Sequence, residues 1–248
     1  AFLLGDRTQL REAPLQSDLE AAGGLHLAAV SGLHVGLVAG AVAAAASLLR
    51  MPRGTRTAAV LGTASLYALV SGATPSVLRA LVMVGCVTLC PRRRRAVGLN
   101  SLGCAALLLI VRRPLIAGDA GFQLSFMATL GILAAAAGPV AKTGPASAGA
   151  GVRKLRGVLT AARASLYAQL ATMPVMSHCF YRLAPWAPIN NLVLLPLGGA
   201  CITITFAAAC LGLIWQPLFG VFAPLLAAAL RILAATAHYM GRFPGSMY

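Results

Sequence analysis

The sequence predicts an all-α polytopic membrane protein, folded as a bundle of about seven to nine transmembrane or re-entrant helices. Hydrophobic residues fill 59% of the 248 positions and charged residues only 10%. The mean hydropathy of the chain is +0.83. Apolar runs, several of them near the roughly 20 residues that cross a bilayer, alternate with short basic segments. A water-soluble domain does not have this composition.

Basic residues exceed acidic ones, and the formal net charge is +15. Most of them lie in segments 50–56, 91–95 and 139–157, whereas residues 1–22 are acidic. Because cytoplasmic loops are rich in Lys and Arg, this pattern predicts a multi-pass inner (plasma) membrane protein with an external N-terminus. We expect residues 1–22 to form an external N-terminal segment and residues 23–248 a transmembrane domain. The charge is also compatible with an anionic substrate.

The first expected span, residues 25–49, places His26, Ser31 and His34 in an apolar run. A membrane interior disfavours polar side chains, so these three should face protein or water. The span is therefore expected to lie centrally in the bundle.

Glycines follow one another at a spacing of four in this span, at Gly32, Gly36 and Gly40. On a continuous helix they form a groove without side chains, which a second helix can approach closely. The glycine pair 23–24 is equally compatible with an interrupted or re-entrant start, provided that protein or water satisfies the freed backbone groups.

Two further spans are expected at residues 57–72 and 75–90. Pro75 suits the first position of a helix, with Thr74 as its N-cap, because a proline there gives up no helical hydrogen bond. The arginine run 92–95 follows, and we expect it to anchor the cytoplasmic surface on anionic lipid.

The fourth and fifth spans are expected at residues 96–111 and 121–138. Asp119 directly precedes the fifth and is a candidate N-cap. Residues 139–157 are rich in Gly, Ala, Pro and Ser, which predicts a flexible cytoplasmic linker.

The sixth span, residues 158–180, carries Ser165, Gln169 and Thr172 on one stripe. Such a stripe favours a bundle interior or a water-filled path. Pro174 is expected to kink or break this helix.

Polar and helix-breaking residues interrupt the apolar stretch 186–215, among them the pair 190–191 and Pro196. We expect two half-helices or a re-entrant hairpin here instead of one straight helix. A last span follows at residues 217–239.

The six cysteines lie in or beside apolar runs, and no two form a CxxC pair. Zinc sites favour short paired spacings, so the cysteines are interpreted as small core residues. We expect no metal and no cofactor.

Four polar clusters lie where exposure to lipid would be costly. With the N-terminus outside, all four fall near the outer ends or outer halves of their helices and should converge on one external vestibule. They are His26, Ser31, Gly32 and His34; Pro75, Ser76 and Arg79; Asp119, Gln123 and Ser125; and Asn190 and Asn191.

Four stretches, HLAAVSGLHVG, GATPSVLRALVM, DAGFQLSFMATLGI and PINNLVLLPL, occur in this order. Together they resemble the membrane core of the ComEC-type competence proteins, over nearly the whole chain. The resemblance implies a channel in the lipid bilayer that admits single-stranded DNA to the cytoplasm during natural transformation. It also implies a DNA receptor and an ATP-driven helicase as partners, and it allows a homodimer.

Full-length relatives often carry a metallo-β-lactamase-like domain, but the 248 residues contain no HxHxDH zinc signature. We therefore expect no enzymatic activity. No GxxxxGK[ST] loop is present either, so an ATP-driven partner or a gradient must supply the drive.

For His26, Ser31 and His34 the sequence leaves three roles open. They are a helix-packing hydrogen-bond network, a polar constriction of the channel, and a metal site completed by Asp119 or His178. Two other functions also stay open: an intramembrane enzyme that uses His26 and His34, and a transporter of another substrate.

Arg79 lies one turn into its helix, where it could snorkel to the external interface or contact a phosphate with its guanidinium fork. Asp119 is expected to cap its helix and to pair with Arg79 or a histidine, because a carboxylate repels an anionic strand. The candidates for lining a hydrated path are Gln123, Ser125, Gln169 and Asn191.

Overall fold

The computed structural model describes residues 14–24, 27, 31–89, 94–137, 150–181, 185–214 and 216–242. Within these ranges every regular element is a helix, which confirms the all-α class. In chain order they are α2 (Pro14–Ala21), α3 (Gly32–Leu48), α4 (Arg53–Val70), α5 (Pro75–Leu89), α6 (Arg94–Arg112), the short 3-10 helix η2 (Pro114–Gly118), α7 (Ala120–Ala137), α8 (Ala150–Phe180), α9 (Ala187–Ile214) and α10 (Gln216–Gly241).

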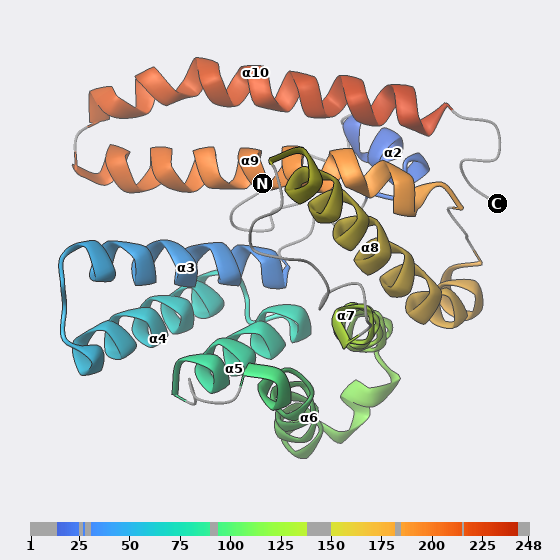
Figure 1. The fold of residues 1–248 in the computed structure, drawn as a ribbon, viewed down its shortest axis with the longest axis horizontal. Helices are drawn as coiled ribbons and strands as arrows, with labels where there is room; N and C mark the ends of the chain where they lie inside the picture. Colours follow the sequence, from blue (N-terminus) through green and yellow to red (C-terminus); the bar gives the residue numbers. More distant parts are fainter. Residues whose placement is uncertain are drawn as a thin grey trace.

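Helices that follow one another in the chain pack side by side. Figure 1 shows this for α3 with α4 and for α9 with α10. The same holds for α5 with α6 and for α7 with α8. Helix α5 also contacts α3, α4 and α7, so it lies centrally in the part of the bundle that they form. Helix α8 packs on α9, and the short helix α2 packs on α10.

Two apolar cores hold these helices together. One joins α2, α9 and α10, and the other joins α3, α4 and α5. Helix α2, from the segment expected to be external, is thus packed into the bundle, while the domain boundary at residue 22 stays a prediction. The residues with no exposed surface are Leu19, Leu194, Leu233 and Ala237 in the first core and Val35, Ala64 and Val77 in the second.

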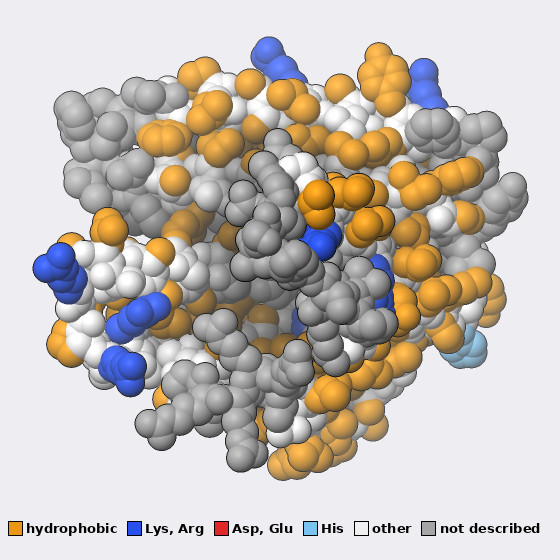
Figure 2. Space-filling view, in the orientation of Figure 1, with side chains coloured by type: hydrophobic (Ala, Val, Ile, Leu, Met, Phe, Trp, Pro, Cys, Tyr) orange, Lys and Arg blue, Asp and Glu red, His pale blue; other side chains and the backbone are white. Residues whose placement is uncertain are grey.

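The outer surface of the bundle is apolar. Within the described residues, three stretches are long and apolar enough to cross a membrane: Ala120–Ala137, Ala187–Ala209 and Phe222–Gly241. Three shorter apolar helices lie at Gly32–Leu48, Pro75–Leu89 and Gly98–Arg112. Figure 2 shows hydrophobic side chains over much of the described surface. A bilayer favours such a surface and water does not, so the chain is a membrane protein.

The first span is shorter than a continuous helix from residue 25 would be. Gly23 follows α2 with a φ of 75°, a backbone conformation in the left-handed region that suits glycine. Helix α3 then begins only at Gly32, with Ser31 as its N-cap. The interrupted start is therefore the correct alternative, and His26 itself lies outside the described residues.

The glycine groove predicted on α3 is only partly formed. A Cβ at Gly32 would lie 3.3 Å from Ala80 Cβ, so α5 does approach there. At Gly36 and Gly40 a Cβ would meet nothing within 4 Å. The expected helix partner is absent at these two positions among the described residues, because α5 crosses α3 only near its start.

Two segments are more helical than predicted. Helix α8 begins at Ala150, so the end of the expected linker is helical, while residues 138–149 lie outside the description. Helix α9 is continuous through Pro196, and the predicted half-helices or hairpin are wrong. Likewise α8 passes through Pro174 without a break. An internal proline removes one backbone hydrogen bond, and contacts with neighbouring helices can maintain the helix around it.

The backbones of α7 and α8 come closest at Gly131. A Cβ there would lie 2.8 Å from the carbonyl carbon of Tyr167 and 3.0 Å from Ala168 Cα. Because both neighbours are backbone atoms, no side-chain rotation could make room, and only glycine fits. The sequence analysis did not single out this position.

Candidate functional site

The guanidinium group of Arg79 connects α5 to α7. Its Nε–H donates to Ser125 Oγ at 2.9 Å, and Nη1 donates to Thr129 Oγ1. Nη1 also lies 3.9 Å from Met83 Sδ on its own helix. The Thr129 hydroxyl donates to the Ser125 carbonyl oxygen at 2.9 Å, so its own oxygen can accept from Arg79. Arg79 thus reaches across to the second and third turns of α7.

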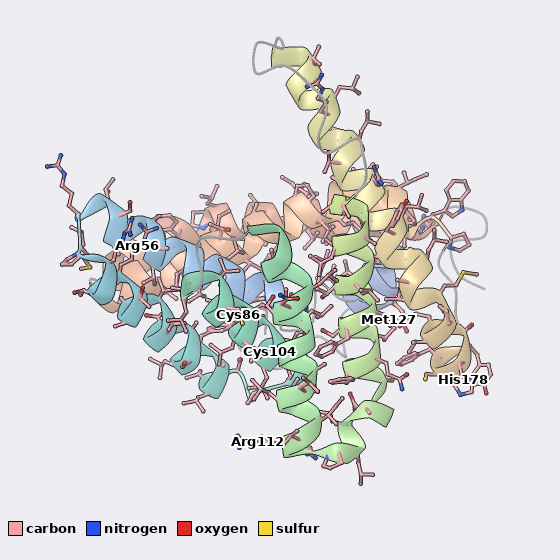
Figure 3. The ribbon with its side chains drawn as sticks, turned by 60° about the horizontal axis from the view of Figure 1, so that its bottom comes forward. Arg56, Cys86, Cys104, Arg112, Met127 and His178 are labelled. Atoms are coloured by element: carbon pink, nitrogen blue, oxygen red, sulfur yellow. The ribbon has the colours of Figure 1, made fainter. Side chains whose placement is uncertain are left out.

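An aromatic ring and a glycine complete the surroundings of Arg79. The ring centroid of Phe126 lies 5.9 Å from Arg79 Cζ, and this ring stacks on Phe122 with centroids 4.2 Å apart. Figure 3 marks this stretch of α7 at Met127. On the α3 side, a Cβ at Gly32 would lie 3.2 Å from Arg79 Nη2, so the missing side chain makes room for the guanidinium. Three helices therefore surround one cation.

No carboxylate pairs with Arg79 in the described part of the chain. There, Asp18 Oδ2 lies 3.1 Å from His238 Nδ1, and Asp119 caps α7. Arg79 Nη2 makes no hydrogen bond to any described residue. Arg79 itself is only partly buried. Neutral groups thus bind two nitrogens of the guanidinium, and within the described residues no carboxylate compensates its positive charge.

Asp119 acts as the N-cap of α7, as predicted. The Phe122 N–H donates to Asp119 Oδ1 at 2.8 Å, and the Gln123 N–H donates to the Asp119 carbonyl at 3.0 Å. Gln123 Nε2 donates to the Ala117 carbonyl at 2.9 Å, which joins η2 to α7. The expected pairing of Asp119 with Arg79 or a histidine is wrong for the described residues, because the helix start already binds this exposed carboxylate.

Ser31 and His34 form a cap at the start of α3. The Ser31 N–H donates to His34 Nδ1 at 3.2 Å, and Ser31 Oγ lies 3.3 Å from the same nitrogen. His34 is buried, with 1% of its surface exposed. This geometry favours the packing network. Among the described residues no group of three His, Cys, Asp or Glu side chains could hold a metal ion.

Asn190 and Asn191 bond residues other than those that hold Arg79. Asn190 Nδ2 donates to the Ala22 carbonyl at 2.9 Å, which fixes α9 to the end of α2. Asn191 Nδ2 lies 3.4 Å from Ser165 Oγ on α8. The expected stripe on α8 therefore faces α9 at Ser165.

Pro75 is the first residue of α5, as predicted, and the Leu78 N–H donates to the Thr74 carbonyl at 2.9 Å. Ser76 is partly buried in the same turn. Neither Pro75 nor Ser76 bonds Arg79.

Of the residues predicted from sequence, the structure brings together Gly32, Arg79 and Ser125. Sequence reasoning missed Phe126 and Thr129. One signal was available, because Ser125 and Thr129 are four residues apart and must share a face of a helix.

These features define an all-α membrane protein in which three helices enclose a partly buried arginine. The chain belongs to the Competence protein family, which matches residues 2–248, and the predicted resemblance is confirmed. It is 30% identical over 205 residues to ComE operon protein 3 of Bacillus subtilis (strain 168). That alignment covers 82% of this chain and 24% of the relative, so the chain spans about a quarter of that protein's length. No solved structure matches the chain.

Proposed function

We propose that this chain forms the passage through which single-stranded DNA crosses the bacterial inner (plasma) membrane into the cytoplasm during natural transformation. Its membership of the Competence protein family supports a role in competence. A DNA receptor would deliver the strand. An ATP-driven helicase, or a gradient, would supply the drive. The passage itself catalyses no reaction in this proposal.

The observation that carries the proposal is that no carboxylate among the described residues pairs with Arg79. A DNA strand brings a negative charge into the membrane with every phosphate, at a high cost in a medium of low dielectric constant. Ser125 and Thr129 fix two nitrogens of the guanidinium, which leaves Nη2 with two N–H donors beside Gly32. An arginine already paired with a carboxylate would have little attraction for phosphate, and in the described part of the chain Arg79 has no such partner.

The proposed orientation explains where the strand would meet Arg79. Arg50, Arg53 and Arg56 are exposed at the corner between α3 and α4, which would lie in the cytoplasm by the positive-inside rule. Figure 3 shows Arg56 at one edge of the bundle and Arg112, at the end of α6, at another. The starts of α5 and α7 would then face outward, and Arg79 would lie within the first turns, where an entering strand begins to lose water.

An intramembrane enzyme has less support. Its candidate base His34 has Nδ1 engaged by Ser31 in the cap of α3. A transporter of another substrate is distinguished by the uptake experiment below.

Uptake of labelled DNA into a nuclease-resistant form tests the proposal in cells that make the complete protein. Arg79→Gln should lower uptake about tenfold or more, because a hydrogen bond to a charged group contributes about 1.5–3 kcal/mol. Arg79→Lys keeps the charge but loses the planar fork, so its DNA uptake should lie between that of the parent and that of Arg79→Gln. Arg56→Gln, which changes an exposed arginine at the bundle edge, is the matched control and should behave as the parent.

Membrane abundance and surface-bound DNA are measured for each variant. Normal uptake by Arg79→Gln at parental abundance would remove the arginine from the translocation route. If the parent protein itself imports no DNA in its own host, the substrate is something else and the transporter alternative gains.

A further inference from the structure

A second arginine, in the membrane-spanning part of the bundle, has no partner among the described residues. Arg231 is at the middle of the apolar stretch Phe222–Gly241 of α10. Its side chain is exposed and makes no hydrogen bond or ion pair within the described ranges. By contrast, Arg163 on α8 has Cζ 5.3 Å from the Tyr167 ring centroid. Arg231 is therefore a charge on the outer surface of a helix that is apolar enough to span a bilayer.

The position of Arg231 makes snorkelling difficult. It is nine residues from Phe222 and ten from Gly241, which at 1.5 Å per residue is about 14–15 Å from either end of the stretch. A bilayer core is about 30 Å thick, so an upright helix would place this charge near its centre. There an arginine costs about 2.5–3.5 kcal/mol on insertion scales. A counter-charge on this face would offset that cost.

Small side chains flank Arg231 on its face of α10. Ala227, Ala228 and Ala235, one turn to either side of it, are all exposed. Small residues let a second helix approach closely in a membrane. The opposite face of α10 is already occupied, since Leu233 is fully buried in the core with α2 and α9. Figure 1 shows α10 along one edge of the bundle, and Figure 2 shows basic side chains standing out there.

The described carboxylates of this chain do not supply the counter-charge. Asp18 is bound to His238 near the end of α10, and Asp119 precedes α7. Glu20 has a contact of its own and lies in α2, outside any candidate span. None of these described carboxylates lies at the membrane depth of Arg231, so a second copy of the chain would not supply the counter-charge from them.

We propose that the Arg231 face of α10 docks a membrane helix from outside these 248 residues, and that this helix carries an Asp or Glu near its middle. The carboxylate would pair with the guanidinium, and the alanines would allow the two backbones to come close. This inference is independent of what passes through the bundle.

Synthetic helices test the inference. The probe is a peptide of alternating Leu and Ala, about 21 residues long, with one central Glu, and its control has Gln at that position. Each carries a fluorophore and is added to vesicles of phosphatidylcholine that contain the complete protein, labelled as the energy-transfer partner. The Glu peptide should associate about tenfold more tightly than the Gln peptide, which corresponds to about 1.4 kcal/mol.

Variants of the protein make the result specific. Arg231→Leu should abolish the preference for Glu over Gln, and Arg231→Lys should keep most of it. Arg242→Leu removes an exposed arginine beyond the spanning stretch of the same helix, and it should keep the preference in full.

Four outcomes would overturn the inference. The two peptides could bind the parent alike, or the preference could survive Arg231→Leu. Alternatively, energy transfer between differently labelled copies of the protein could depend on Arg231, which would make the face a contact between copies. Loss of the Glu preference on adding phosphatidylglycerol would assign the counter-charge to lipid and also refute the docked helix.

Discussion

Replacing Gly131 with alanine should force α7 and α8 apart. The new Cβ would lie 2.8 Å from the Tyr167 carbonyl carbon and 3.0 Å from Ala168 Cα. Carbon atoms in contact prefer about 3.5–4.0 Å, so the helices must separate locally by roughly 0.5–1 Å. Overpacking of this kind costs about 1–3 kcal/mol, and alanine recovers about 1 kcal/mol through its better helix propensity. Because the obstacle is backbone, we expect a net loss near about 1–2 kcal/mol.

The assay is thermal unfolding of the purified protein in detergent, followed by tryptophan fluorescence. For a chain of this size the loss corresponds to a fall in Tm of about 2–8 °C. Gly36→Ala is the matched control, since a Cβ there meets nothing within 4 Å. Its Tm should equal that of the parent or exceed it slightly. If the Tm of Gly131→Ala equalled that of Gly36→Ala, the close approach of α7 to α8 would be refuted.

Two further predictions concern α7. Thr129→Val removes an acceptor of Arg79 Nη1 without changing shape and should lower DNA uptake several-fold, with Thr129→Ser restoring it. Thr236→Val is the control, because the Thr236 hydroxyl bonds the Ile232 carbonyl of its own helix, and it should leave uptake unchanged. Equal uptake by both valine variants would contradict the role of Thr129. Asp119→Ala removes the cap of α7 and should cost about 1 kcal/mol in detergent unfolding, and a Tm equal to that of the parent would show that this cap contributes nothing.

Local features of the site were predictable. The start of α5 at Pro75 and the cap at Asp119 depend on backbone groups within a few residues, which the sequence places next to each other. By contrast, the break predicted in α9 near Pro196 was wrong, because the continuity of this helix depends on residues distant in the chain. Whether a helix continues past a proline depends on what packs along it, and α10 and α8 both pack along α9.

The partners of Arg79 could not be predicted. Its hydrogen bonds to Ser125 and Thr129 join residues 46 and 50 positions apart in the chain. Many pairings of polar residues among the helices are compatible with the same apolar pattern. The expected pairing with Asp119 failed because the carboxylate of Asp119 accepts a hydrogen bond from the Phe122 N–H, three residues along the chain, as the cap of α7.

The sequence by itself determined that this protein is a helical membrane protein, roughly where its helices lie, and that charged residues inside them need an explanation. Transfer from water to lipid and the capping of helix ends depend on composition and near neighbours, so they can be predicted from the chain alone. Only the tertiary structure decided that α7 holds Arg79, that Gly131 touches the backbone of α8 and that Arg231 is left exposed on α10. Those outcomes depend on which helix faces meet, and packing between helices distant in the chain sets this.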